Sequence, residues 1–138
     1  MSVNLIPFAR DAAALWPQVV DWLDDALTKT HSLMTTDDLL RGVRSGAHRL
    51  WLAHHNDRVV AAFVTEIVRG GRGGAVNVLA LGGSGLDAWL DEVVESLDAY
   101  ARANDCVYVV EMGRAGWNRV LAKRGWVSGP CVMMKVTR

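Results

Sequence analysis

The chain has 138 residues, of which 51% are hydrophobic and 22% are charged, enough for one domain with a substantial core and too few for two ordinary ones. Fifteen basic side chains balance 15 acidic ones, and a net charge of zero argues against a general binder of nucleic acid or of anionic membranes. The sequence contains no apolar run long enough to span a membrane and no secretory signal, so we expect one globular domain over residues 1–138 in the cytoplasm.

The first half of the sequence predicts a strand, two helices and a hairpin. Residues 3–8 have the pattern of a short strand, and residues 12–28 carry apolar side chains at helical spacing. A second helix is expected after Thr35, where hydroxyl and acidic residues can cap a helix start. The apolar segments 49–54 and 58–68 flank an Asn-Asp pair, which predicts a hairpin turn.

The second half alternates strands and helices. Its expected elements are a strand (75–81), a glycine-rich loop (82–85), an amphipathic helix (86–104), a strand (106–112), a short helix (117–124) and a last strand (132–136). The strand at 106–112 is apolar throughout, which is typical of a strand buried on both faces. The whole pattern indicates an α/β domain with helices on both sides of a sheet.

Two motifs stand out in this order of elements. Residues 78–85 read Val-Leu-Ala-Leu-Gly-Gly-Ser-Gly, and residues 120–126 read Val-Leu-Ala-Lys-Arg-Gly-Trp. Together with the element order they resemble the acetyl-CoA strand, pyrophosphate loop and closing motif of the GCN5-related N-acetyltransferases, the GNAT superfamily. The Gly-Arg-Ala-Gly-Trp sequence at 113–117 resembles, in particular, small GNAT-like proteins encoded by tailed phages and prophages.

The resemblance implies a fold and a cofactor. The fold would be a single GNAT-like domain with a central mixed, mostly antiparallel sheet of about six to seven strands, two N-terminal helices and two later helices on its faces. The cofactor would be acetyl-CoA, with its pyrophosphate on the loop and its pantetheine along the preceding strand. The cofactor-binding residues implied are Leu79, Leu81, Gly82, Gly83, Ser84, Gly85, Leu86 and Arg114.

The glycine-rich loop has two interpretations. Backbone N–H groups at the start of a helix can hold an anion without help from side chains, and on this view Gly83→Glu should abolish cofactor binding with little loss of folding. Alternatively, Ser84 and Asp87 form a capping box. Asp87 and Asp91 would also repel a diphosphate placed close to the helix start.

The catalytic groups are less clear. Leu121 stands where the superfamily has a tyrosine that protonates the departing thiolate, so general acid help of about 10²–10⁴-fold would be missing. Glu66, late in the strand 58–68, is the candidate base that takes the amine proton, because a carboxylate among apolar neighbours is a stronger proton acceptor. Alternatively, Glu66 faces water at the end of the strand. No histidine pair has the spacing of a metal site, so we expect no metal.

Two functions follow from these observations. The first is an acyl-CoA-dependent N-acyltransferase of the phage GNAT-like type, which would use acetyl-CoA and an unknown amine acceptor. The second is a non-catalytic GNAT-fold phage protein that acts in virion assembly or binds a host protein, with a protein partner or a second copy of itself. The glycines and Arg114 favour the first, and Leu121 with the acidic residues after the loop favours the second. If phage-encoded, the protein would lie in the host cytoplasm or in the virion.

Overall fold

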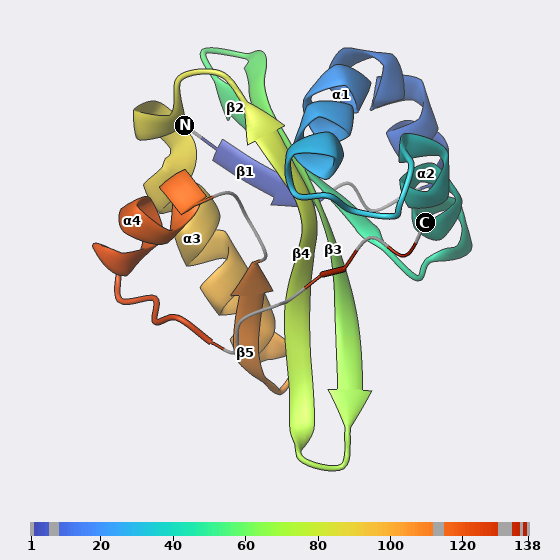
Figure 1. Cartoon of the computed structure of the whole chain (residues 1–138). Helices are drawn as coiled ribbons and strands as arrows, with labels where there is room; N and C mark the ends of the chain where they lie inside the picture. Colours follow the sequence, from blue (N-terminus) through green and yellow to red (C-terminus); the bar gives the residue numbers. More distant parts are fainter. Residues whose placement is uncertain (1, 6–8, 112–114, 130–133, 136, 138) are drawn as a thin grey trace.

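Five strands and four helices make up the described part of the chain (Figure 1). The computed structural model describes residues 2–5, 9–111, 115–129, 134–135 and 137. The elements are β1 (Ser2–Leu5), α1 (Ala9–Lys29), α2 (Thr36–Ser45), β2 (Arg49–His55), β3 (Arg58–Gly70), β4 (Gly73–Gly83), α3 (Leu86–Ala103), β5 (Cys106–Glu111) and α4 (Ala115–Ala122). None of the described helices is both long and apolar enough to cross a bilayer.

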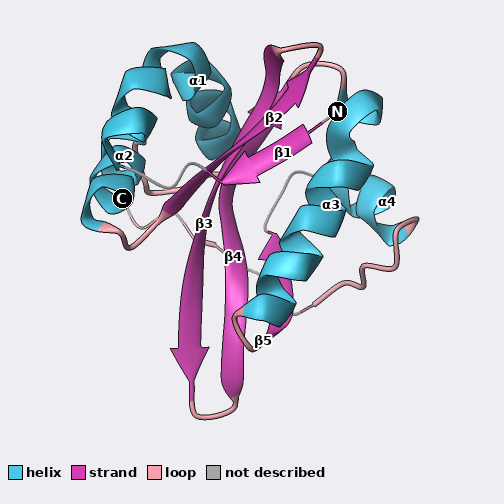
Figure 2. Ribbon diagram, turned by 180° about the vertical axis from the view of Figure 1, so that it is seen from behind, coloured by secondary structure: helices cyan, strands magenta, loops and turns pink. Residues whose placement is uncertain are grey.

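The strands form one sheet in the order β1-β2-β3-β4-β5. All neighbours are antiparallel except β4 and β5, which are parallel. Helices α1 and α2 lie on one face of the sheet, and α3 and α4 lie on the other (Figure 2). The predicted α/β architecture with a mixed, mostly antiparallel sheet is confirmed. The described sheet has five strands where six to seven were expected, and the strand predicted at 132–136 falls mostly outside the described residues.

Local sequence signals set several boundaries as predicted. The Thr35 hydroxyl accepts a hydrogen bond from the Asp38 backbone N–H, and the Asp38 carboxylate accepts one from Thr35 N–H at 2.8 Å. This second bond lowers the pKa of the Asp38 carboxyl below its usual value. Asn56 and Asp57 both have positive φ, 51° and 60° respectively, in the left-handed region that a type I′ hairpin turn requires.

Strand alternation divides the core into two clusters, one on each face of the sheet. In β2, Leu50 and Leu52 face α1 and α2, whereas Trp51 and Ala53 face α3. Strand β3 is buried on both faces over its middle residues, as its apolar pattern predicted. The largest fully buried side chains are Trp89, Phe63, Leu23, Leu39, Leu50, Leu52 and Leu90.

Trp51 is a core residue, which the sequence alone left open. Its ring stacks on Phe63 with the centroids 5.4 Å apart. Its indole Nε1–H donates to the buried hydroxyl of Thr65 at 3.0 Å, so the one polar atom of the side chain has a partner inside the core. Tyr100 packs edge-on against the same ring at 5.0 Å.

Strand β5 differs from its prediction as a buried strand. Val107 and Tyr108 are 63% and 68% exposed, and β5 lies at the edge of the described sheet with β4 as its neighbour. An unbroken apolar run predicts burial on both faces only if further elements cover the strand. In the described part of the chain, α3 is the helix packed nearest to β5, and it covers one face.

The predicted glycine-rich loop is shorter than expected, because Gly82 and Gly83 belong to β4. Both are sites of close backbone approach. A Cβ on Gly82 would lie 2.7 Å from the carbonyl oxygen of Trp22 in α1, and a Cβ on Gly83 would lie 2.3 Å from that of Val60 in β3. The expectation that Gly83→Glu would spare the fold is therefore wrong, since the strand itself has no room for a side chain there.

We predict that Gly83→Ala lowers the free energy of unfolding by about 1–3 kcal/mol, because the new methyl group overlaps the backbone of β3. Urea denaturation followed by circular dichroism measures this change. Gly71→Ala, in the turn between β3 and β4 where nothing lies within 4 Å of an added Cβ, is the matched control and should change stability by less than about 0.5 kcal/mol. Equal effects of the two substitutions would contradict the packing role of Gly83.

Candidate functional site

The pairing of β4 with β5 ends at Glu111, the last residue of β5 that the structure describes. Their parallel pairing runs from Gly74 with Cys106 to Val78 with Glu111, but β4 continues to Gly83 with β3 as its partner. At the point of divergence β4 also carries a bulge, since Val78 pairs with Thr65 and Ala80 with Val64, which leaves Leu79 as the extra residue. Ligands of α/β sheets commonly bind where strands diverge at this edge.

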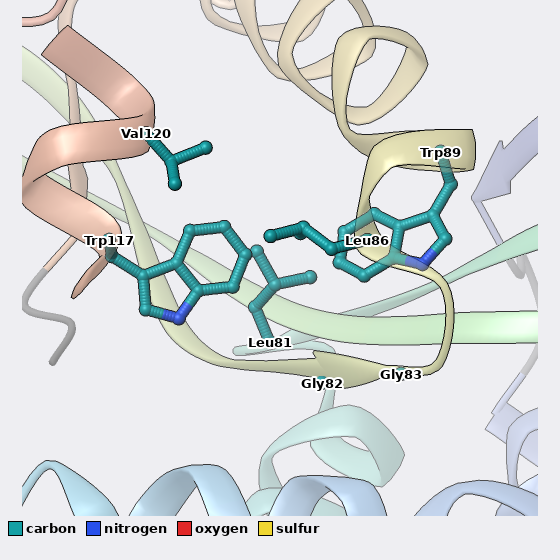
Figure 3. Close-up of a pocket in the computed structure, with 7 residues that line it drawn as sticks. All are labelled: Leu81, Gly82, Gly83, Leu86, Trp89, Trp117 and Val120. Carbon is teal, nitrogen blue, oxygen red and sulfur yellow. The ribbon is translucent and has the colours of Figure 1, made fainter.

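A cavity of about 370 Å³ opens beside the diverging end of β4. It is lined by Leu81, Gly82 and Gly83 of β4, Leu86 and Trp89 of α3, and Trp117 and Val120 of α4. Figure 3 shows Leu81 pointing from the strand into the space between Trp117 and Leu86. The volume is in the usual range for small-molecule sites, which are mostly apolar with a few polar groups.

The amino end of α3 borders this cavity through Leu86. Its N-cap is Gly85, with φ 69° and no side-chain hydrogen bond at the cap. The capping box predicted from Ser84 and Asp87 depends on a side chain, that of Asp87, which lies outside the described part of the structure. Two hydrogen bonds to backbone atoms of Ser84 fix the connection between β4 and α3. Ser84 N–H donates to Val60 O at 2.9 Å, and the indole of Trp89 donates to Ser84 O at 2.8 Å. Ala88 N–H donates to Gly85 O at 2.9 Å, and the N–H groups before it lie at the helix start, where an anion can bind.

An ion pair joins α3 to the residues that follow α4. Arg124 Nε lies 2.6 Å from Asp91 Oδ1, and its Nη1 donates to Val120 O at 3.0 Å. The rings of Trp89 and Trp117 are 6.4 Å apart, tilted at 44°. Asp91 was expected to repel a diphosphate, but Arg124 balances its charge. The expected repulsion is therefore weaker.

A second, much smaller cavity of about 10 Å³ lies beside the same end of β4. Its walls come from α1 and the residue after it, from β4, from the end of β5 and from α4. The lining residues are Ala26, Thr30, Leu79, Ala80, Leu81, Glu111 and Trp117. Leu81 and Trp117 line both cavities, so the two spaces share part of their walls.

The structure places the predicted cofactor residues around this divergence. Four of them line the large cavity (Leu81, Gly82, Gly83 and Leu86), and Leu79 lines the small one. Ser84 and Gly85 form the connection between β4 and α3. Arg114 lies outside the described residues. Sequence reasoning missed Trp89 and Val120 as cavity residues, because their helical spacing predicts only that they face the sheet.

No protein-family model matches this sequence, and no curated protein matches it. Solved structures match nearly the whole chain. A GNAT family acetyltransferase from Staphylococcus aureus subsp. aureus has a TM-score of 0.68 at 12% identity, covering 99% of this chain and 100% of its own. Ribosomal-protein-alanine N-acetyltransferase from Brucella melitensis gives 0.70 at 11%, covering 100% of both chains. Glucosamine-6-phosphate N-acetyltransferase from Arabidopsis thaliana gives 0.67 at 14%, covering 99% and 98%.

This chain has the GNAT fold. The likeness extends from end to end, which confirms the fold that the two sequence motifs implied. At identities of 11–14% it is a likeness of fold, and function has to be argued from the site itself. The resemblance to phage-encoded members remains a prediction.

The tyrosine position of the GNAT closing motif is filled by a core residue here. Leu121 is 7% exposed and is absent from the lining of both cavities. Tyr100 packs against Trp51, and Tyr108 is exposed on β5. Among the described residues, therefore, no tyrosine borders either cavity. The described residues also contain no group of three metal-ligating side chains.

Glu66, the candidate base, lies outside both cavities. Its Oε2 is 3.3 Å from His48 Nε2, and His48 is only 9% exposed. The imidazole packs against α2, where a Cβ on Gly42 would lie 1.8 Å from its Nδ1. Glu66 pairs with Asn77 of β4, before the strands diverge. This environment indicates that Glu66 anchors the histidine under α2, a contact that no sequence pattern predicts.

We predict that Glu66→Ala lowers the free energy of unfolding by about 1–3 kcal/mol, because His48 would lose the acceptor of its Nε2 while its buried Nδ1 already lacks a partner. Chemical denaturation measures the loss. The control is Glu95→Ala on the exposed face of α3, which should change stability by less than about 0.5 kcal/mol. If Glu66→Ala kept full stability but abolished catalysis, the anchoring role would be refuted in favour of the base.

Proposed function

We propose that this protein is an acyl-CoA-dependent N-acyltransferase that uses acetyl-CoA. The observation that carries the proposal is the 370 Å³ cavity between the freed end of β4, the start of α3 and the aromatic face of α4. Apolar side chains line most of this cavity, and the N–H groups of the α3 start border it. A long, flexible ligand with an apolar arm and an anionic group would match both surfaces. The GNAT fold of the chain supports this choice.

The chain's own groups suit the parts of acetyl-CoA. Beyond Val78, no strand among the described residues pairs with β4 on the β5 side, and backbone N–H and C=O groups need partners. The amides of the pantetheine arm can provide them by extending the sheet edge. The N–H groups at Gly85 and Leu86 would receive the pyrophosphate, and Arg114, between β5 and α4 in the sequence, is proposed as a further phosphate ligand.

Catalysis would depend mainly on positioning. When bound, acetyl-CoA supplies an activated thioester, and the protein holds an amine in line with the carbonyl carbon, which alone can contribute several kcal/mol. A thiol with a pKa of about 8.5 leaves as a thiolate without much help. The absence of a tyrosine at Leu121 then costs the general acid contribution and leaves the reaction otherwise intact.

The test is calorimetric titration of the purified protein with acetyl-CoA and with CoA, after removal of any ligand retained from expression. Binding at micromolar concentration would support the proposal. No heat and no thermal stabilisation at millimolar ligand would refute it, and the search would turn to protein partners.

We predict that Val120→Phe weakens acetyl-CoA binding about tenfold or more, because the larger ring fills the cavity that Val120 lines. Tenfold corresponds to about 1.4 kcal/mol. The matched control is Asn118→Phe, which adds an aromatic ring to the exposed face of the same helix and should leave the dissociation constant within about twofold. Equal affinities of the two variants would show that the ligand does not enter this cavity.

A further inference from the structure

Trp117 offers the two cavities a hydrogen-bond donor that is not in use. Its side chain lines both of them, and its Nε1–H has no partner among the described residues. The other tryptophan of the large cavity differs, because Trp89 donates its Nε1–H to Ser84 O at 2.8 Å. An indole N–H can only donate, so the group on Trp117 suits an acceptor atom of a ligand.

In the described part of the chain, no other side chain around the cavities offers such a donor. The remaining walls of the large cavity are aliphatic side chains and glycines. In the small cavity, the Thr30 hydroxyl already donates to Ala26 O at 2.9 Å, and a carboxylate such as that of Glu111 only accepts. A ligand oxygen that reaches this region therefore meets Trp117 as its side-chain donor.

The donor has a defined direction. Figure 3 shows the nitrogen edge of the Trp117 ring turned toward β4, with the six-membered ring turned toward Leu86. The ring of Trp89 lies 6.4 Å away, tilted at 44°. The Nε1–H therefore faces the strand along which the pantetheine arm is proposed to lie.

The proposed orientation of acetyl-CoA brings its reactive end to the same place. With the pyrophosphate at the start of α3, the arm runs back along β4 from Gly83 toward Leu79. Residues Leu79, Ala80 and Leu81 line the small cavity together with Trp117. The thioester, at the far end of the arm, would thus lie beside the indole.

We propose that the Trp117 Nε1–H binds the carbonyl oxygen of the thioester and stabilises the negative charge that this oxygen acquires as the amine attacks. The inference deepens the proposed function and rests on it. Donors fixed in advance at such an oxygen are effective, since removal of one commonly costs about 10²–10³-fold in rate. An indole is too weak an acid to give up its proton, so this role differs from the general acid that Leu121 cannot provide.

The electrons move in a balanced sequence. The lone pair of a neutral amine bonds to the carbonyl carbon, and the π pair of the C=O bond moves to the oxygen that Trp117 holds. That pair then re-forms the C=O bond while the carbon–sulfur bond breaks, and the bonding pair leaves with the sulfur. One proton passes from the nitrogen to the thiolate through water. The products are an amide and a thiol, and the indole keeps its proton throughout.

The first test observes the N–H itself and needs no turnover. The six tryptophans give indole ¹H–¹⁵N signals, and that of Trp117 is assigned by its absence in Trp117→Phe. Two stable ligands are compared on the wild-type protein. One is acetyl-dethia-CoA, a ketone with CH₂ in place of the sulfur, and the other is S-ethyl-CoA, a thioether without a carbonyl. The Trp117 signal should move downfield with the ketone and much less with the thioether.

The second test changes one atom of the ring. Trp117 is exchanged for 3-benzothienylalanine, which has sulfur in place of the N–H and keeps the shape of the side chain. Release of CoA from acetyl-CoA is followed with hydroxylamine as the nucleophile, because a donor on the thioester assists any attacking amine. The exchange should lower kcat about 10²-fold or more and leave the dissociation constant of acetyl-CoA unchanged. The control Trp126→Phe, at a tryptophan that lines neither cavity, should keep the wild-type rate.

The outcomes separate this inference from the proposed function. Equal shifts with the two ligands, or a benzothienylalanine variant as fast as wild type, would overturn the inference alone. So would a variant that binds acetyl-CoA less tightly but keeps kcat, because Trp117 would then only shape the cavity wall. Wild-type protein that binds neither acetyl-CoA nor the two analogues would overturn the proposed function and the inference with it. Thermal denaturation verifies folding, and if the ring exchange prevents it, the ligand comparison on wild type decides.

Discussion

The structure depends on one constraint at the backbone of β4, which among the described residues has a strand on each side only as far as Val78. Backbone polar groups away from water need partners. The end of β4 pairs with β3 on one side and, in the described part of the chain, with no strand on the other. Both cavities lie beside this end of β4. The topology of the sheet thus determines where the candidate site lies, and the side chains around it determine the shape and polarity of the cavity.

The floor of the large cavity is rigid because its glycines are packed. Gly82 lies against the α1 backbone at Trp22, and Gly83 lies against β3, so this segment cannot bend as a free loop would. Ser84 continues the contact by donating to Val60 O. A preformed floor lowers the entropy lost when a flexible ligand is ordered on it. Gly85 alone, with its positive φ, makes the turn into α3.

Features that depend on neighbours in the sequence were predictable, and those that depend on distant contacts were not. The cap at Thr35 and the turn at Asn56 follow from adjacent residues. The roles of Gly82 and Gly83 depend on the backbone of α1 and β3 that packs against them. The sequence does not show these contacts, because a glycine needed for close approach looks the same in sequence as one in a loop. Glu66 and Glu111 differ in the same way. Each lies late in an apolar segment, and only the packing of α1 and α2 distinguishes an anchor for a histidine from a wall of a cavity.

Trp117 borders both cavities, so its indole ring is a wall that the two spaces share. A ligand that fixed the ring on one side would set the shape available on the other. Any coupling between two ligands bound there would be reciprocal and of equal size in both directions. One aromatic side chain on a short helix would be enough to transmit that coupling without a change in the sheet.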